Sequence, residues 1–345
     1  MSAIRTTGLT KRYDGVLAVD DLDLRVERGE VFGFLGPNGA GKSTVINLLL
    51  DFIRPTAGAA TVLGYDSQTE TTAIRRNTGI VPEGASLYER LTGREHLAWI
   101  ARANDVEADV PALLDRVGLA NDDADRRVSG YSKGMRRRLA LAMALLGDPE
   151  LLILDEPSAG LDPAGIREFR NIVREEAADG RTVFFSSHVL GQVEAVADRI
   201  GILNGGTLVA TGTPAELRGT RGITESIRFE VTAVPDLAAL EAVDGVETVS
   251  VNSDDVGTTS ESDRSSIEVG VCDSTSKITA ATWLAERTRV RDVVSEARSL
   301  EALFDAYTST GRSAQSNART NGQSVTQNGT SAGVQQSRDS EEVEA

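Results

Sequence analysis

A glycine-rich segment near the start of the chain has the residue types and spacing of a phosphate-binding loop. It reads Gly36-Pro37-Asn38-Gly39-Ala40-Gly41-Lys42-Ser43 and is followed by Thr44. The glycines let the backbone wrap tightly and turn its N–H groups toward phosphate oxygens, and a following helix would add its positive N-terminal end. Lys42 can reach the β- and γ-phosphates of a nucleoside triphosphate, and the Ser43 hydroxyl can bind Mg²⁺. A chance glycine-rich turn of this pattern should occur in about one chain in a hundred of this length.

Two adjacent carboxylates end an apolar run further along the chain. Leu151–Leu154 is followed directly by Asp155 and Glu156. Asp155 is suited to holding Mg²⁺, directly or through water, and Glu156 to orienting or deprotonating an attacking water. Two acids at the end of a buried strand are costly unless a cation or a substrate uses them. The alternative is a strand that runs into an acidic turn, and the phosphate loop in the same chain disfavours it.

The segment upstream of these acids indicates a family. It reads Ser129-Gly130-Tyr131-Ser132-Lys133-Gly134-Met135-Arg136-Arg137-Arg138-Leu139. Together with the two motifs above, it resembles the signature of ABC transporter ATP-binding subunits, and the resemblance covers residues 4–218. The family's usual core is Leu-Ser-Gly-Gly-Gln, so the first glycine and the glutamine are replaced here.

In that family the signature opens a helix and contacts the γ-phosphate bound by the other subunit. The resemblance therefore assigns ATP contacts to Ser132, Lys133 and Gly134, and the N-terminal end of the helix favours an anion. Lys133 has two open interpretations: it adds a positive charge near the phosphate, or it is only a solvated side chain.

Other elements of the family follow in order. Tyr13 occupies the position of the aromatic residue that stacks on adenine; the alternative is a partly buried core tyrosine. Asp162 ends a segment, Ser158-Ala159-Gly160-Leu161-Asp162, that resembles the D-loop crossing the dimer interface. His188 matches the histidine that contacts the γ-phosphate, although a lone histidine is usually structural. His96 has no such context, and we expect it on a helix surface or at a subunit contact.

One position departs from the family pattern. The family usually has a glutamine after the strand at 79–81, and here that position is Glu83. A glutamine donates and accepts hydrogen bonds, whereas an ionised glutamate only accepts them. Glu83 could still reach Mg²⁺ or the attacking water, so we include it with Ser43 and Asp155 as a candidate metal ligand.

A further segment resembles the surface that meets the membrane subunit. Residues 87–95 mix apolar and charged side chains, as partner interfaces do, although a solvated helix face would have the same pattern. Residues 299–304 resemble the end of ATPases that serve ABC-2-type exporters. The resemblance therefore favours export over uptake.

The composition limits the compartment and the partners. The chain has 345 residues, a formal net charge of −16 and one cysteine, Cys272. One cysteine excludes an internal disulfide and fits a reducing compartment. No run of about 18 apolar residues and no signal pattern is present, so we expect no transmembrane helix. We expect a cytoplasmic protein, held at the inner face of the membrane by a permease, and no nucleic-acid partner, because phosphates would be repelled.

The acidity has two explanations. A strongly acidic surface with few lysines resembles proteins of salt-loving microbes, and lysine stands only at positions 11, 42, 133 and 277. The alternative is an acidic tail on an ordinary protein. Acidic residues recur along the whole chain, which favours the salt-adapted interpretation.

Hydrophobic periodicity predicts one α/β unit over residues 1–219, and the resemblance implies that this unit is a P-loop ABC cassette with a mixed sheet core and a helical subdomain at about 83–147. We expect strands at 4–10, 21–28, 30–35, 79–81, 151–154 and 182–185, and helices at 43–53, 93–103, 110–117, 132–147 and 163–179. Residues 224–308 predict a small α+β domain in the ferredoxin-like order β-α-β-β-α-β with a final helix at 299–307. Residues 309–345, rich in Ser, Asn, Gln and Gly with an acidic end, predict a disordered tail.

The resemblance implies one mechanism. Two copies would meet head to tail around two MgATP, each ATP lying between the phosphate loop of one copy and residues 132–134 of the other. Lys42, His188 and Glu156 would carry out hydrolysis, and a separate multi-span permease would convert closure into transport. The alternatives are a soluble ABC-type ATPase of translation or repair, which would usually carry two cassettes or a long insertion, and a purely regulatory nucleotide-binding module.

Overall fold

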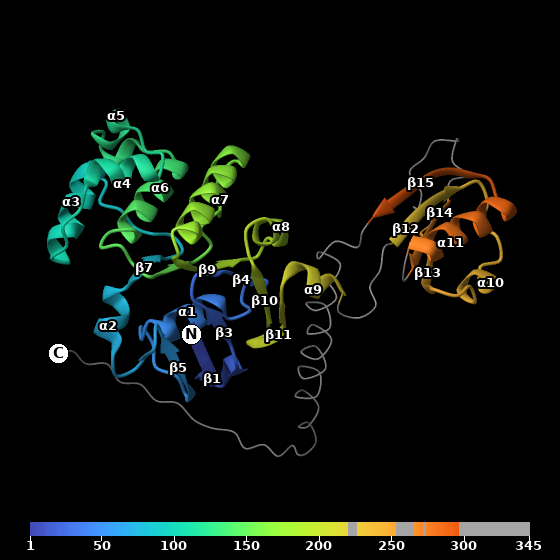
Figure 1. Ribbon diagram of the computed structural model, residues 1–345, viewed down its shortest axis with the longest axis horizontal. Helices are drawn as coiled ribbons and strands as arrows, with labels where there is room; N and C mark the ends of the chain where they lie inside the picture. The colour runs from blue at the N-terminus through green and yellow to red at the C-terminus, as the bar shows by residue number, and fades with distance from the viewer. Residues whose placement is uncertain (220–225, 253–264, 272–273, 297–345) are drawn as a thin grey trace, which may run out of the picture.

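The computed structural model describes residues 1–219, 226–252, 265–271 and 274–296 (Figure 1). The helix predicted at 299–307, the exporter-like segment at 299–304 and the tail predicted at 309–345 lie outside these residues. Among the described residues, no helix is long and apolar enough to cross a membrane.

A six-stranded sheet forms the centre of residues 1–219, in the order β11-β10-β4-β9-β8-β7. All neighbours pair in parallel except the edge pair β10–β11. The five parallel strands are short, mostly apolar and mostly buried, as expected for a parallel sheet covered on both faces, whereas the edge strand β11 is largely exposed. Their bounds are β4 Val31–Leu35, β7 Thr78–Val81, β8 Leu151–Leu154, β9 Thr182–Ser187, β10 Arg199–Asn204 and β11 Thr207–Gly212.

The register of this sheet brings three loops to one edge. Leu35 of β4 pairs with Ser187 of β9, and Leu154 of β8 pairs with Phe185 of β9. The phosphate loop, the two acids and the segment that holds His188 therefore leave the sheet side by side, as ligand-binding loops do at the carboxyl ends of parallel strands.

A second, antiparallel sheet contains the strands of the N-terminal segment. Its path is β2-β1-β5-β6, and β3 also pairs with β1. The bounds are β1 Ser2–Tyr13, β2 Val16–Leu22, β3 Arg25–Glu27, β5 Ala57–Val62 and β6 Tyr65–Asp66. The prediction of one strand at 21–28 is wrong. The buried Thr6 hydroxyl donates to Leu22 O at 2.6 Å and accepts from Leu24 N at 2.8 Å, which holds a break between β2 and β3.

Four of the predicted helices are confirmed. Their bounds agree with the prediction within one or two residues, except that α6 ends at Ala144 and not at residue 147. They are α3 Gly93–Ala103, α4 Val110–Arg116, α6 Lys133–Ala144 and α7 Pro163–Ala178. Figure 1 shows α3, α4, α5 and α6 grouped together beyond β7. Side-chain caps begin α3 at Thr92, α6 at Ser132 and α7 at Asp162. The limits of a separate helical subdomain at 83–147 stay a prediction.

The helix after the phosphate loop, α1, spans Lys42–Leu49 and ends before the predicted residue 53. Asp51 has a positive φ of 51°, which an α-helix cannot accommodate, so the chain turns there. The remaining helices of this part were not predicted: α2 Thr71–Arg76, α5 Asn121–Ala124, α8 Leu190–Glu194 and α9 Pro214–Gly219.

The described residues after 225 contain a four-stranded antiparallel sheet in the order β13-β14-β12-β15. Its elements are β12 Ser226–Val231, α10 Ala238–Glu241, β13 Val246–Asn252, β14 Ser265–Val271, α11 Ser274–Arg287 and β15 Val290–Glu296. They surround an apolar cluster of their own, in which Phe229 and Leu284 are fully buried. The assignment of this segment to a separate ferredoxin-like domain stays a prediction.

Phe184 lies at the centre of the core below the six-stranded sheet. Its ring stacks on Phe32, with centroids 5.9 Å apart, and contacts Phe34 at 5.3 Å. We expect Phe184→Ala to lower the free energy of unfolding by about 3–5 kcal/mol, because the ring is lost and a cavity remains. Urea titration followed by circular dichroism measures this change. Phe52→Ala is the matched control, since Phe52 is 54% exposed; equal losses in both variants would contradict the assignment of Phe184 to the core.

Candidate nucleotide-binding and hydrolysis site

The phosphate loop joins β4 to α1, as the sequence predicts. Two of its glycines lie where no side chain fits: a Cβ on Gly36 would stand 2.5 Å from Leu203 O, and one on Gly41 would stand 2.4 Å from Ala18 O. Gly41 also has a φ of 106°, a backbone conformation that favours glycine. The loop is tied to the sheet by Gly36 N–H, which donates to Ser187 O at 3.1 Å.

Lys42 lies inside the loop with only 7% of its side chain exposed. Its ammonium donates to Gly36 O at 2.6 Å and to Pro37 O at 3.3 Å. It also lies 3.2 Å from Glu156 Oε1, so the charge is buried together with an opposite charge. The three donors of the ammonium are therefore engaged within the loop and by Glu156, and phosphate oxygens would replace some of these contacts when a nucleotide binds.

Glu156 is the most constrained residue of the site. Its backbone has a φ of 45°, which is uncommon for a residue with a side chain. Its N–H donates to Ser186 Oγ at 2.9 Å, and its Oε2 lies 2.9 Å from His188 Nδ1. Because an ionised carboxylate only accepts hydrogen bonds, Nδ1 of His188 carries the proton in this contact. The predicted catalytic residues Lys42, Glu156 and His188 thus lie together.

The second oxygen of this carboxylate, Glu156 Oε1, is buried and accepts no hydrogen bond from any described residue. It nevertheless lies within ion-pair distance of the Lys42 ammonium, so its charge is compensated although the alignment for a hydrogen bond is poor. An oxygen in this condition is able to accept a proton from a water or to orient one, which is the role predicted for Glu156.

Asp155 is 6% exposed, and its Oδ1 accepts a hydrogen bond of 2.5 Å from Ser186 Oγ. In the described part of the chain it forms no ion pair, so its buried charge suits a cation. Ser43 is partly buried at the start of α1, and Glu83 is exposed in the loop after β7. Hydroxyl and carboxylate oxygens are the ligands that Mg²⁺ prefers, and Mg²⁺ in nucleotide sites takes few protein ligands beside the phosphates. The residues therefore fit Mg²⁺ bound together with a nucleotide.

Ser186 was missed in the sequence analysis, although it joins the two acids. It is fully buried, and its single hydroxyl donates to Asp155 and accepts from Glu156 N–H. A serine at the end of an apolar strand carries no signal by itself. Only the pairing of β8 with β9 places it beside the two acids.

The signature residues lie apart from these groups in the single chain. Ser132 and Lys133 are exposed, and Ser132 Oγ caps α6 by accepting from Met135 N–H at 3.2 Å. Among the described residues, no hydrogen bond or ion pair joins residues 132–134 to residues 36–44. Asp162 likewise caps α7, accepting from Gly165 N–H at 2.7 Å. The structure does not bring Ser132, Lys133, Gly134 or Asp162 to the phosphate loop of the same chain.

Comparison with known proteins identifies the family. A family profile described as "ABC transporter" matches residues 19–159. The daunorubicin/doxorubicin resistance ATP-binding protein DrrA of Streptomyces peucetius is 42% identical over 228 residues, which are 64% of this chain and 68% of that protein. The chain belongs to the ABC transporter family, as an ATP-binding subunit. The bacitracin transport ATP-binding protein BcrA of Bacillus licheniformis is 41% identical over 60% of this chain and 68% of its own.

Solved structures agree with this assignment. The ATP-binding subunit of an ABC transporter is 32% identical and superimposes with a TM-score of 0.58 over 63% of this chain and 92% of its own. A bacterial ABC exporter of the Atm1 family with ATP bound is 26% identical, with a TM-score of 0.56 over 63% of this chain and 39% of its own. Residues 1–219 therefore have the fold of an ABC cassette, and the chain is an ATPase of this family.

Two aromatic predictions of the ABC subunit have different outcomes. Tyr13 ends β1 with 43% exposure, and the Lys11 ammonium lies 4.9 Å from its ring centroid. Tyr13 is not among the residues of the described core clusters, and adenine stacking stays a prediction. His96 is only 1% exposed, so its expected place on a helix surface or at a subunit contact is wrong. Its Nε2 accepts from Tyr88 N–H at 2.8 Å, and its Nδ1 lies 2.9 Å from Thr92 O.

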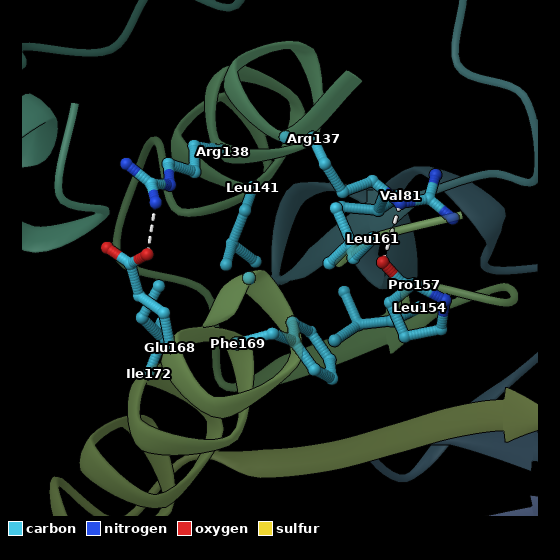
Figure 2. Close-up of a pocket in the computed structure, with 12 residues that line it drawn as sticks. Val81, Arg137, Arg138, Leu141, Leu154, Pro157, Leu161, Glu168, Phe169 and Ile172 are labelled. Carbon is cyan, nitrogen blue, oxygen red and sulfur yellow. Dashed lines mark hydrogen bonds and ion pairs between the residues drawn. The ribbon is translucent and has the colours of Figure 1, made fainter. Parts of the chain in front are cut away.

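Arg137 is a second residue that the motif analysis missed. It stands in α6, and its Nε donates to Pro157 O at 2.7 Å, as the dashed line in Figure 2 shows. Its Nη2 donates to Glu156 O. Burial lowers the pKa of Arg137, and the negative charges of Asp155, Glu83 and Glu156 oppose that shift. The run of three arginines after the signature was the available signal, but it does not show which arginine turns inward.

We expect Glu156→Gln to reduce steady-state ATP hydrolysis by at least about a hundredfold, because an amide cannot accept the proton of the water. ATP binding should persist, since Lys42 and the loop are unchanged; a fluorescent ATP analogue measures it. Glu150→Gln is the matched control, because Glu150 is a half-exposed glutamate paired with Arg28 at the opposite end of β8. Near-normal hydrolysis by the Glu156 variant would show that another group acts on the water.

Proposed function

We propose that this chain powers export through a separate membrane permease by closing as a head-to-tail dimer around two MgATP. One observation carries the proposal: Lys42, Glu156 and His188 are assembled on one side of the site, whereas the signature of the same chain is exposed and makes no bond to its own phosphate loop. Each chain thus carries the phosphate-loop side of one ATP site and the signature side of another. A second copy in the opposite orientation supplies the other side of each site.

ATP stabilises the closed dimer because it contacts both halves only when they meet, which is differential binding to one state. Ser132 Oγ and the N-terminal end of α6 face the γ-phosphate on the partner, where a helix end favours negative charge. Lys133 adds an ammonium at the same place. In the described part of this chain it forms no ion pair, and it lies against Gly160 of the D-loop, where an added Cβ would come within 1.8 Å of its Nζ.

Mg²⁺ belongs to this site together with the nucleotide. Ser43 and Asp155 would hold it, and Glu83 lies on the loop that follows the neighbouring strand. When bound, the ion neutralises the charge of the phosphates. The chain itself then orients the γ-phosphate through Lys42 and His188, and it orients and deprotonates the water through Glu156.

The permease contact is proposed at the segment that precedes and begins α3. Tyr88 is 60% exposed and Trp99 47% exposed, and their rings meet edge to face at 5.4 Å. Exposed aromatic side chains in contact are typical of partner surfaces. The buried His96 holds this segment in place, because its Nε2 accepts a hydrogen bond from Tyr88 N–H. Binding there would hold the chain at the inner face of the membrane.

Export is supported by the relatives, whose names concern drug resistance, bacitracin transport and Nod factor export. Each of these proteins is an ATP-binding component, so the cargo of this chain is not decided by them. Co-purification of the tagged chain with a multi-span membrane protein supports the transport role; recovery with ribosomes or DNA would favour a soluble ABC ATPase instead.

The dimer is tested with the Glu156→Gln chain, which should bind ATP without hydrolysing it. We expect size-exclusion chromatography with light scattering to show a dimer with MgATP and a monomer with MgADP. A second substitution, Ser132→Arg, should abolish the dimer and leave ATP binding intact, because a bulky cation cannot fit between helix α6 and the opposing phosphate. A monomer with MgATP in the Glu156→Gln chain would refute the proposed function.

A further inference from the structure

Helix α6 carries two groups that face different parts of the protein. Its N-cap, Ser132, begins the signature, and Arg137 follows about one and a half turns later. The Arg137 guanidinium reaches the carbonyls of the loop that follows β8: Pro157 O at 2.7 Å, Glu156 O, and more distantly Asp155 O at 3.5 Å. A longer contact of 3.5 Å joins it to Pro82 O at the end of β7. One side chain thus binds the backbone on both sides of the catalytic carboxylate.

The backbone held by Arg137 is also the one under strain. Glu156 has a φ of 45°, a conformation that is strained for a residue with a side chain and persists only where the surroundings impose it. Ser186 imposes it from the N–H side and Arg137 from the carbonyl side. A guanidinium has five donors in a rigid fork, so it fixes direction as well as distance.

We propose that Arg137 is a positioning residue that couples the two ATP sites of the dimer. The proposal rests on the proposed head-to-tail function. The γ-phosphate of ATP bound to the partner's phosphate loop attracts the N-terminal end of α6 at Ser132 and shifts the helix. Arg137 carries that shift to Glu156 of its own chain, which serves the other ATP. Occupation of one site therefore sets the geometry of the hydrolytic group in the other.

The packing around α6 permits such a shift. A small cavity of about 30 Å³ lies between α6, the end of β8 and α7, and Figure 2 shows Arg137 and Arg138 on its α6 side and Phe169 and Ile172 on its α7 side. Arg138 is bonded to Glu168 of α7 and to Gly118 O at 2.8 Å. The helix is thus anchored to α7 by Arg138 and to the catalytic loop by Arg137, with unfilled space between the two attachments.

The test compares Arg137→Lys and Arg137→Met with Arg136→Lys in the full chain. Arg136 is the adjacent arginine of the same helix and pairs with Glu89 rather than with the catalytic loop. A lysine keeps the charge but cannot bind two carbonyls in fixed directions. We expect both Arg137 variants to bind ATP normally and to keep KM within about twofold, and kcat to fall on the order of tenfold or more, because the carboxylate is misplaced.

The decisive readout is the Hill coefficient for ATP in hydrolysis, which a merely structural role would not move. It should be higher in the wild type and in Arg136→Lys than in Arg137→Lys, because ATP-driven dimerisation makes all three chains cooperative and the coupling adds to it only where Arg137 is present. A reduced kcat with an unchanged Hill coefficient, or no change in either, would overturn the coupling. A wild-type chain without cooperativity would also overturn it.

If the Arg137 variants do not fold, amide hydrogen exchange of residues 155 and 156 in the Glu156→Gln chain supplies the test. Protection of this segment should rise on formation of the MgATP dimer and not on ATP binding to the monomeric chain that also carries Ser132→Arg. Equal protection in both would overturn the coupling. The two failures are distinguishable: the proposed function fails if no dimer forms, whereas this inference fails if the dimer forms and the segment or the Hill coefficient does not respond.

Discussion

The register of three parallel strands is the constraint on which the site depends. Because β4, β9 and β8 end at the same edge of the sheet, the loops that follow them leave together, and Lys42, His188 and Glu156 meet although they come from separate parts of the chain. Aromatic packing of Phe32, Phe34 and Phe184 below these strands holds the register. Any shift between the strands would separate the ammonium from the carboxylate, since a slip of one residue moves each side chain to the other face.

The edge of the sheet concentrates charge that the rest of the fold must compensate. Two carboxylates and an ammonium are almost completely buried there. The structure compensates Glu156 with Lys42 and His188, and it gives Asp155 a serine hydroxyl. A buried, hydrogen-bonded charge cluster is costly to build and is rigid once built, which suits a group that must act on one water beside a phosphate. The groups proposed to hydrolyse ATP are therefore assembled within one chain, whereas the proposed ATP site is complete only when a second copy adds its signature.

The chemical motifs were readable from the sequence because each is local. Residues 36–44, the pair Asp155 and Glu156, and the cap at Ser132 work through neighbours in the chain, and the helices α3, α4, α6 and α7 follow from their periodicity and caps. Ser186 and Arg137 were missed because their roles arise from strand pairing and from a helix packed on a distant loop. His96 was misjudged for the same reason: its partners, Tyr88 N–H and Thr92 O, become visible only when the turn before α3 is folded.

If each ATP is enclosed by two copies, two variants that are inactive alone should form one working site when they are mixed. One variant carries Lys42→Ala and an intact signature; the other carries Ser132→Arg and an intact phosphate loop. Each homodimer has no complete site, but a mixed dimer has one. We expect the mixture to hydrolyse ATP while neither component does. A mixture as inactive as its components, with both chains folded, would contradict a shared ATP site.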